Sequence, residues 1–269
     1  MNRLTIVKIG GNVIDNPESL ERFLTDFAAI EGYKILIHGG GKIATKLSAD
    51  LGIQTRLVEG RRVTDADSLK IVTMVYAGLI NKTITAGLQG KNCNAIGLTG
   101  ADGNIIKAVK RPIRKHPSTG SDLDYGFVGD LDENSVNTDS IDKLLQAGFV
   151  PVFAAITHDG SGQLFNTNAD TISSVLAAAM AQRYTTSLVY CFEKKGVLEN
   201  IEDEDSVIPE INYKKYNNLK QQGIISEGMI PKLDNAFDAI GKGLKEVYIG
   251  KADALPFLRE QNFGTRLII

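Results

Sequence analysis

Two stretches of the chain, VKIGGN at residues 7–12 and LIHGGGK at residues 36–42, each place consecutive glycines directly after a short apolar run. Both runs are rich in Ile, Leu and Val, which is typical of buried β-strands. A helical pattern follows each glycine turn: one begins at Asn16-Pro17-Glu18, and the other extends to about Leu51. The start of the chain therefore predicts two successive units of strand, glycine turn and helix.

The same alternation continues to the end of the chain. We expect further helices at 64–88, 138–147, 168–182 and 230–241, and further strands at 94–100, 149–156, 185–192, 246–250 and 265–269. The stretch 101–130 is irregular, and 111–126 is typical of a long functional loop. Strands separated by helices need crossover connections, which favour a mainly parallel sheet with helices on both faces. The predicted fold class is α/β, a three-layer α/β/α sandwich around that sheet.

Composition excludes several classes of protein. The 269 residues carry 30 Lys+Arg and 32 Asp+Glu, a formal charge of −2, which argues against the broad basic surface of a nucleic-acid binder. Cys93 and Cys191 lie far apart in sequence, so neither a disulfide framework nor a zinc cluster is indicated. The apolar run at 175–181 is much shorter than the ~18 residues of a membrane span. Because we also see no targeting signal, we expect a cytoplasmic protein that binds neither nucleic acid nor membrane.

The glycines and Lys8 point to an anion site. Glycine at a strand end lets backbone N–H groups approach a ligand, and the N-terminus of a following helix adds partial positive charge. Two such turns in one parallel sheet open on the same carboxyl edge, where ligands of α/β folds bind. Lys8 interrupts an apolar strand just before Gly10-Gly11. It either extends to solvent at the strand end or meets an anion, and phosphate explains it better.

Known phosphate motifs match only weakly. The P-loop pattern GxxxxGK[ST] is absent, whereas Gly39, Gly41 and Ala44 fit GxGxxA after a strand, with Glu59 as a possible ribose ligand. This fingerprint keeps an NAD-dependent dehydrogenase as an alternative, but it leaves Gly10-Gly11 without a role.

A set of motifs covers essentially the whole chain in one order. They are KIGG at 8–11, HGGGK at 38–42, GRRVTDAD at 60–67, GLTGADG at 97–103, GFVGD at 126–130, NTNAD at 166–170 and EGMIPKLDNA at 227–236. In this order and spacing the chain resembles the amino acid kinase superfamily, and most closely its acetylglutamate kinases. The resemblance implies ATP-dependent phosphorylation of the γ-carboxylate of N-acetyl-L-glutamate, the second step of arginine biosynthesis, on the amino acid kinase fold.

The resemblance also implies roles for individual residues. Lys8 and Lys232 would contact the transferring phosphoryl group, and Asp170 would hold both lysines. Backbone groups of Gly10, Gly11, Gly40 and Gly41 would bind phosphate and substrate. Arg62 would bind the substrate α-carboxylate, and Asn166 would bind near the N-acyl amide. ATP would carry Mg²⁺ on its phosphates, without a dedicated protein metal site.

From the residues alone, plainer roles for several of these side chains stay open. Arg61-Arg62 could be a solvated pair, and Asn166 a loop residue before a helix that Asn168 caps. Asp170 could serve only the helix dipole. Lys232 lies at a helix start, the unfavourable end for a cation, which is mild support for a ligand.

The chain departs from the family pattern at 191–198, CFEKKGVL, where relatives carry an Asp near the nucleotide. Glu193 is our candidate replacement, and Lys194-Lys195 could meet ATP phosphate or solvent. Relatives inhibited by arginine have an additional N-terminal helix, so this chain resembles the arginine-insensitive dimeric kind. We expect a homodimer, with the apolar side chains of helix 65–88 at its interface: Leu69, Val72, Met74, Val75 and Leu79.

Two lobes on one continuous sheet fit this resemblance. Residues 1–170 would bind the N-acylglutamate and form the dimer, and residues 171–269 would bind ATP. One rival reading keeps the chemistry but takes a larger acyl group, as in N-succinyl-L-glutamate. Kinases of carbamate, aspartate, glutamate or UMP are disfavoured by the GRRVT and NTNAD motifs. A non-catalytic amino-acid sensor is disfavoured because Lys8 and Lys232 are both present.

Overall fold

A computed structural model describes residues 1–58, 60–116, 118–225, 229–260 and 263–269, and at Arg259 only the backbone. Its central sheet has eight strands. From one edge to the other they are β14 (Glu210–Asn212), β16 (Thr265–Ile268), β15 (Glu246–Lys251), β13 (Thr185–Phe192), β1 (Arg3–Ile9), β2 (Tyr33–His38), β10 (Val150–Ala154) and β5 (Ala95–Leu98). All neighbouring strands are parallel except β15 and β16. The mainly parallel sheet is confirmed.

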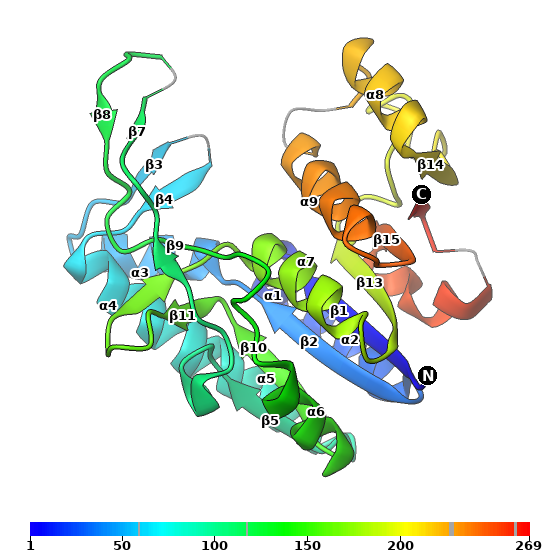
Figure 1. Cartoon of the computed structure of the whole chain (residues 1–269), viewed down its shortest axis with the longest axis horizontal. Coiled ribbons are helices and arrows are strands. Elements are labelled where there is room, and N and C mark those ends of the chain that lie inside the picture. The colour runs from blue at the N-terminus through cyan, green and yellow to red at the C-terminus, as the bar shows by residue number, and fades with distance from the viewer. Residues whose placement is uncertain (59, 117, 226–228, 261–262) are drawn as a thin grey trace.

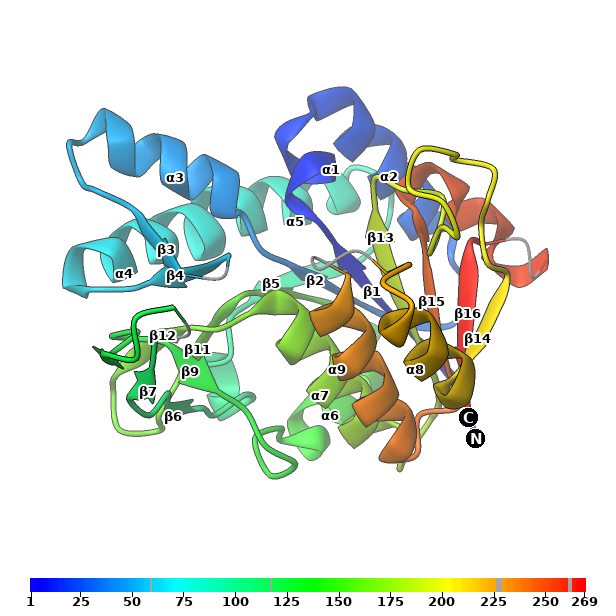
Figure 2. The same ribbon diagram turned by 90° about the horizontal axis from the view of Figure 1, so that it is seen from above.

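Helices cover both faces of this sheet, which Figure 2 shows edge-on. One layer contains α1 (Gly11–Asp15), α2 (Pro17–Ala29), α3 (Gly41–Asp50), α4 (Ala66–Thr73), the π-helix η1 (Met74–Ile80), α5 (Asn81–Gln89) and the 3₁₀ helix η3 (Ala252–Glu260). The other contains α6 (Thr138–Gln146), α7 (Ala169–Met180), α8 (Tyr213–Gln221) and α9 (Ile230–Gly241). The three-layer α/β/α sandwich is therefore confirmed, while α1, α8 and η3 were not predicted.

The central strands are mostly apolar, as expected where helices bury both of their faces. In β1, Leu4, Ile6, Val7 and Ile9 are all at most 1% exposed. Lys8 is a charged exception near the carboxyl end of this apolar strand, so its position needs a specific partner.

The helix predicted at 64–88 is one continuous helix, Ala66–Gln89, built from α4, η1 and α5. By length and composition alone it could cross a membrane, but core helices of soluble proteins pass the same test, and its face with Ile71 and Ile84 is buried in the core. The expected interface residues divide between its two sides. Val72 and Val75 are buried inside the fold, so their placement at an interface was wrong, whereas Met74 and Leu79 are 54% and 58% exposed.

Four two-stranded antiparallel sheets and a 3₁₀ turn accompany the central sheet within the described residues. Three are hairpins: β3 (Arg56–Val58) with β4 (Arg61–Val63), β7 (Arg114–Lys115) with β8 (Asp122–Leu123), and β11 (Ile156–His158) with β12 (Leu164–Asn166). In the fourth, β6 (Val109–Lys110) pairs with β9 (Gly129–Asp130), and the turn is η2 (Asp102–Asn104). β3–β4 and β7–β8 project from the same end of the molecule (Figure 1). A small separate core of Val58, Leu123, Tyr125 and Val128 joins the two hairpins.

The sheet divides along the sequence. Strands that precede residue 170 occupy one side, strands that follow it occupy the other, and β1 pairs with β13 where they meet. The carboxyl ends of β1, β2 and β13 therefore lie side by side. The assignment of 1–170 and 171–269 as lobes with separate ligands stays a prediction.

The cap of α2 offers a test of local stability. The Asn16 side chain accepts a hydrogen bond from the Ser19 N–H at 2.8 Å, as the sequence predicts. Asn16→Ala should lower the free energy of unfolding by about 1 kcal/mol, measured by urea denaturation, because that N–H loses its acceptor. Asn16→Asp is the matched control, since it keeps the acceptor and should retain wild-type stability. Unchanged stability in Asn16→Ala would contradict this role.

Candidate active site

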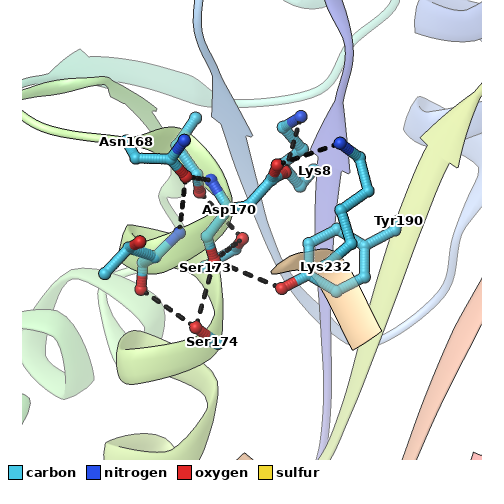
Figure 3. Close-up of polar contacts among 9 residues, drawn as sticks. Lys8, Asn168, Asp170, Ser173, Ser174, Tyr190 and Lys232 are labelled. Carbon is cyan, nitrogen blue, oxygen red and sulfur yellow. Dashed lines mark hydrogen bonds and ion pairs between the residues drawn. The ribbon is translucent and has the colours of Figure 1, made fainter. Parts of the chain in front are cut away.

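The start of α7 places one carboxylate at the carboxyl edge of the sheet. Asn168 caps this helix, because its side-chain oxygen accepts from the N–H groups of Asp170 and Thr171 at 2.8 and 3.0 Å. The Tyr190 hydroxyl of β13 donates to the Asp170 backbone carbonyl at 3.2 Å. These contacts fix the first turn of α7, and Figure 3 shows the Asp170 side chain extending from it toward two lysines.

Asp170 forms ion pairs with both lysines that the motifs single out. Lys8 Nζ in β1 lies 2.7 Å from one carboxylate oxygen, and Lys232 Nζ in the first turn of α9 lies 3.4 Å from the other. The side chains of Lys8, Asp170 and Lys232 are 13%, 12% and 28% exposed. Asp170 thus does more than serve a helix dipole, and Lys8 pairs with a carboxylate instead of extending to solvent. Two ammonium groups and one carboxylate leave a net positive charge there.

The surroundings of Asp170 act on its pKa in opposite directions. Burial raises the pKa, but the charges of Lys8 and Lys232 and their hydrogen bonds outweigh burial, so the net pKa lies below its ordinary value. The carboxylate is therefore ionised at neutral pH.

The two glycine turns are used differently. The Gly10 N–H donates to the Cys191 carbonyl at 3.1 Å, continuing the pairing of β1 with β13. The Gly10 N–H is therefore already engaged within the sheet, and phosphate binding at Gly10 stays a prediction. Gly11 and Gly41 are the first residues of α1 and α3, and the N–H groups of a first helical turn have no acceptor inside their helix.

A cavity of about 630 Å³ opens beside the second turn. Its lining includes Gly39–Gly41, Thr45, Arg62, Tyr76, Arg111, Val128, Asn166 and Asn168. Its size lies within the range of roughly 300–1,000 Å³ that is typical of small-molecule sites.

Arg62 is the buried member of the arginine pair, at 8% exposed, while Arg61 is exposed. Its guanidinium donates to the hydroxyls of Thr55 at 2.9 Å and Thr45 at 2.7 Å, and to the Gly41 carbonyl at 3.0 Å. All three acceptors are neutral. Within the described residues no carboxylate pairs with Arg62, so this buried charge suits an anionic ligand.

Asn166 ends β12 and also lines the cavity. Its side-chain amide donates to the Thr64 hydroxyl at 3.0 Å, and its backbone N–H donates to the Phe127 carbonyl at 3.0 Å. The GRRVT and NTNAD motifs are thus held together by direct contact, with the amide group oriented at the cavity wall.

Several residues that line this cavity were not expected from the sequence. Tyr76 comes from the π-helix and contacts the glycine turn, Thr45 orients Arg62, and Arg111 pairs with Asp130 at 2.7 Å. The helical spacing of Thr45 after the glycines was the one available signal. Tyr76 and Arg111 gave none, because their positions depend on the π-turn and on a short hairpin.

Glu193 lies outside this group. It is exposed just beyond β13 and lines a smaller cavity with Asn12, Arg22 and Lys251. Lys194 and Lys195 pair with Glu204 at 3.5 Å and Asp205 at 2.5 Å. Both lysine side chains are also partly exposed to solvent, at 40% and 47%, and a contact of either with ATP phosphate stays a prediction. A nucleotide contact for Glu193 stays a prediction.

Two expectations fall partly outside the described residues. Glu59, the candidate ribose ligand of a dehydrogenase, is not described, and neither are the first two positions of EGMIPKLDNA. Within the described part of the chain, no group of three or more His, Cys, Asp or Glu side chains is arranged to hold a metal ion.

The model of the amino acid kinase family matches residues 3–251. The chain belongs to this family. It is 53% identical to an acetylglutamate kinase of Cytophaga hutchinsonii, covering 100% of this chain and 99% of that one, and 53% identical to an acetylglutamate kinase of Phocaeicola vulgatus, covering 94% and 95%. These relatives place the chain among the acetylglutamate kinases, and they favour a phosphotransferase over a dehydrogenase.

A solved structure extends the likeness of fold. An N-acetylglutamate synthase of Neisseria gonorrhoeae, complexed with coenzyme A and N-acetyl-glutamate, superposes with a TM-score of 0.79 at 20% identity. The match covers 99% of this chain and 59% of the synthase. At this identity the likeness concerns the fold alone.

The charge balance at Asp170 is testable by titration. In protein with ¹³C-labelled aspartate, NMR titration should give the Asp170 carboxyl a pKa below its ordinary value of 3.8. The ionised carboxylate therefore stabilises the fold at pH values above the unfolded-state pKa, and this stabilisation is lost as the pH falls through the folded-state pKa. Lys8→Met should raise the Asp170 pKa, because it removes the largest favourable charge. A midpoint above 3.8 in the wild type, or no shift in Lys8→Met, would contradict this balance.

Proposed function

We propose that this protein transfers the γ-phosphoryl group of ATP to the γ-carboxylate of N-acetyl-L-glutamate, as in the second step of arginine biosynthesis. The observation that carries the proposal is the Asp170 carboxylate, which pairs with Lys8 and Lys232 at the carboxyl edge of the sheet. The family membership and the acetylglutamate kinase relatives support it.

The chemistry needs charge compensation more than a base. The substrate γ-carboxylate has an ordinary pKa near ~4.3 and is ionised at neutral pH. One of its oxygens forms a bond to the γ-phosphorus, the bond between that phosphorus and the β,γ-bridging oxygen breaks, and ADP leaves with the electron pair. An anion thus approaches a polyanion, and catalysis consists mainly of positioning and electrostatic stabilisation. Lys8 and Lys232 supply two positive charges for this purpose.

Residues around the cavity take the other roles. Arg62, whose partners are neutral, binds the substrate α-carboxylate in a bidentate fork. Asn166 binds near the N-acyl amide. Gly11, Gly40 and Gly41 donate backbone N–H groups to phosphate or carboxylate oxygens, and Glu193 contacts the nucleotide.

ATP enters with Mg²⁺ on its phosphates. The residues of the site fit this arrangement, since Asp170 is engaged by two lysines and the site offers cations and N–H donors to the phosphates. Mg²⁺ keeps several waters and binds largely through substrate phosphates. When bound, it neutralises part of the developing negative charge.

The resemblance to acetylglutamate kinases also suggests how the two halves of the chain divide the ligands and how two copies associate. We propose that residues 1–170 bind the N-acylglutamate and residues 171–269 bind ATP, in a cytoplasmic homodimer. The exposed Met74 and Leu79 on the long helix support an interface there, since large apolar side chains gain from burial against a second copy.

One observation favours a second candidate substrate with a larger acyl group. Five cationic residues line the cavity, namely Lys42, Lys46, Arg61, Arg62 and Arg111, and no described Asp or Glu does. N-Acetyl-L-glutamate brings two carboxylates, whereas N-succinyl-L-glutamate brings three. The excess of cations therefore supports N-succinyl-L-glutamate as the alternative substrate.

A coupled ADP-release assay tests the proposed reaction. With ATP and Mg²⁺, N-acetyl-L-glutamate should drive ADP release and free L-glutamate should not, because only the acylated compound presents the amide that Asn166 contacts. N-Succinyl-L-glutamate in a parallel reaction ranks the two acyl groups by kcat/KM. Lys8→Met should lower kcat by about 10²-fold or more, as loss of one transition-state donor does.

Two results would contradict the proposal. ADP release that is the same with and without an N-acylglutamate would exclude the kinase reaction. Binding of an N-acylglutamate without any turnover would favour the sensor alternative.

The Arg62 role has its own test. Arg62→Gln should raise KM for N-acetyl-L-glutamate by about 10-fold or more and change KM for ATP little, because a charged hydrogen bond contributes ~1.5–3 kcal/mol. Arg62→Lys keeps the charge but loses the planar fork, so it should restore only part of the affinity. An equal rise of both KM values would assign Arg62 to general stability instead.

A further inference from the structure

We propose that His38, which the reaction above does not use, is a positioning residue: through Asn81 and the Gly39 carbonyl it locks the Gly39–Gly40 peptide so that the Gly40 N–H faces the substrate cavity. The proposal deepens the proposed function, because it assigns the origin of one anion-binding N–H group. It rests on four observations about the end of β2.

The first observation is a buried chain of hydrogen bonds. The Asn81 side-chain amide lies 2.9 Å from the Val152 carbonyl and 3.0 Å from His38 Nε2. His38 Nδ1 in turn lies 2.9 Å from the Gly39 carbonyl. His38 and Asn81 are both 0% exposed. The chain thus links strand β10, the long helix and the glycine turn in the absence of solvent.

These partners determine the tautomer of His38. The Asn81 nitrogen donates to the Val152 carbonyl and can donate its second hydrogen only to an unprotonated Nε2. The Gly39 carbonyl can only accept, so Nδ1 must carry the hydrogen. Burial lowers the pKa of His38 to about 4, with a smaller opposing effect from the Gly39 hydrogen bond. The ring is therefore neutral and protonated at Nδ1 at physiological pH.

The second observation concerns the geometry of the Gly39–Gly40 peptide. In a planar trans peptide the carbonyl oxygen and the following N–H point in opposite directions. Because His38 holds the Gly39 oxygen on one side, the Gly40 N–H is directed to the other. Gly40 lines the cavity, and among the described residues no acceptor receives its N–H. Buried backbone N–H groups are rarely left unpaired, so this donor suits a ligand oxygen.

The third observation is that close packing leaves no space for a side chain at Gly40. A Cβ at Gly40 would lie 2.2 Å from Ile80 Cδ1 and 3.0 Å from the Tyr76 ring. Tyr76 and Ile80 both come from η1, and Asn81 follows it directly. A π-turn places residues four and five positions apart on one face, and such turns occur frequently at functional sites. Here the π-turn directs Tyr76 and Ile80, which pack against Gly40, and Asn81, which contacts His38, toward the same glycine turn.

The fourth observation is a separate contact two peptides further along, at the Gly41–Lys42 peptide. The Gly41 carbonyl accepts from Arg62 at 3.0 Å and from the Thr45 hydroxyl at 2.8 Å. The carbonyls of Gly39 and Gly41 are thus both held by named side chains. The backbone between them has its N–H groups left for the cavity.

Kinetics on three variants test the positioning role. His38→Leu removes the donor and should lower kcat by about 10-fold or more, while both KM values change by less than about 3-fold, because a misdirected oxyanion donor costs mainly transition-state stabilisation. His38→Asn can place an amide N–H where Nδ1 lies and should recover most of kcat. Ile35→Ala, in the same strand and 0% exposed, is the control that loses core packing without contacting the turn.

Two measurements keep the test decisive if a variant folds poorly. Urea denaturation of all variants separates lost stability from lost rate. ¹⁵N NMR of wild-type His38 should show the neutral Nδ1–H tautomer between pH 6 and 8. This second result does not depend on the substrate, so it can still overturn the proposal if no N-acylglutamate drives ADP release.

Any of three results would overturn the proposal. They are an Nε2–H tautomer or a charged ring for His38, wild-type kcat in His38→Leu, or losses of kcat in His38→Leu, His38→Asn and Ile35→Ala that simply follow their losses of stability.

Discussion

The pairing of one nearly buried carboxylate with two lysines is the interaction on which the site depends. Asp170 comes from the start of α7, Lys8 from the carboxyl end of β1 and Lys232 from the first turn of α9. Neither lysine position suits an isolated charge: Lys8 interrupts an apolar strand, and Lys232 lies at the positive end of a helix. The carboxylate makes both tolerable and leaves an excess positive charge at the edge of the sheet. The ion pairs also connect strands and helices from the two halves of the chain.

Elsewhere in the site, other positively charged or N–H groups are likewise placed where a ligand can meet them. Arg62 is buried among neutral acceptors, and Gly11, Gly40 and Gly41 present backbone N–H groups for which the described residues offer no acceptor. Each is a donor whose acceptor is to come from a ligand. For a reaction between two anions, such pre-arranged donors need no reorganisation when the charges meet. The sheet positions them because β1, β2 and β13 end side by side.

Much of this could be predicted from the sequence, and the parts that could not have a physical reason. Apolar runs predicted the buried strands, and Asn16 and Asn168 predicted helix starts, because both signals are local. The spacing of whole motifs pointed to Lys8, Asp170 and Lys232. The use of the Gly10 N–H by Cys191 depends on the register of β1 with β13, which no local pattern encodes. The π-turn at Tyr76 and the hairpin that positions Arg111 likewise depend on tertiary packing.

If Asp170 acts by holding Lys8, the two residues must act as one unit in phosphoryl transfer. The most direct measurement is a double-mutant cycle on the single-turnover rate at saturating ATP and N-acetyl-L-glutamate, with Lys8→Met, Asp170→Asn and the double variant. We expect strong non-additivity, with the double variant little slower than the slower single variant. A rate loss in the double variant equal to the product of the two single losses would show instead that Lys8 and Asp170 act independently.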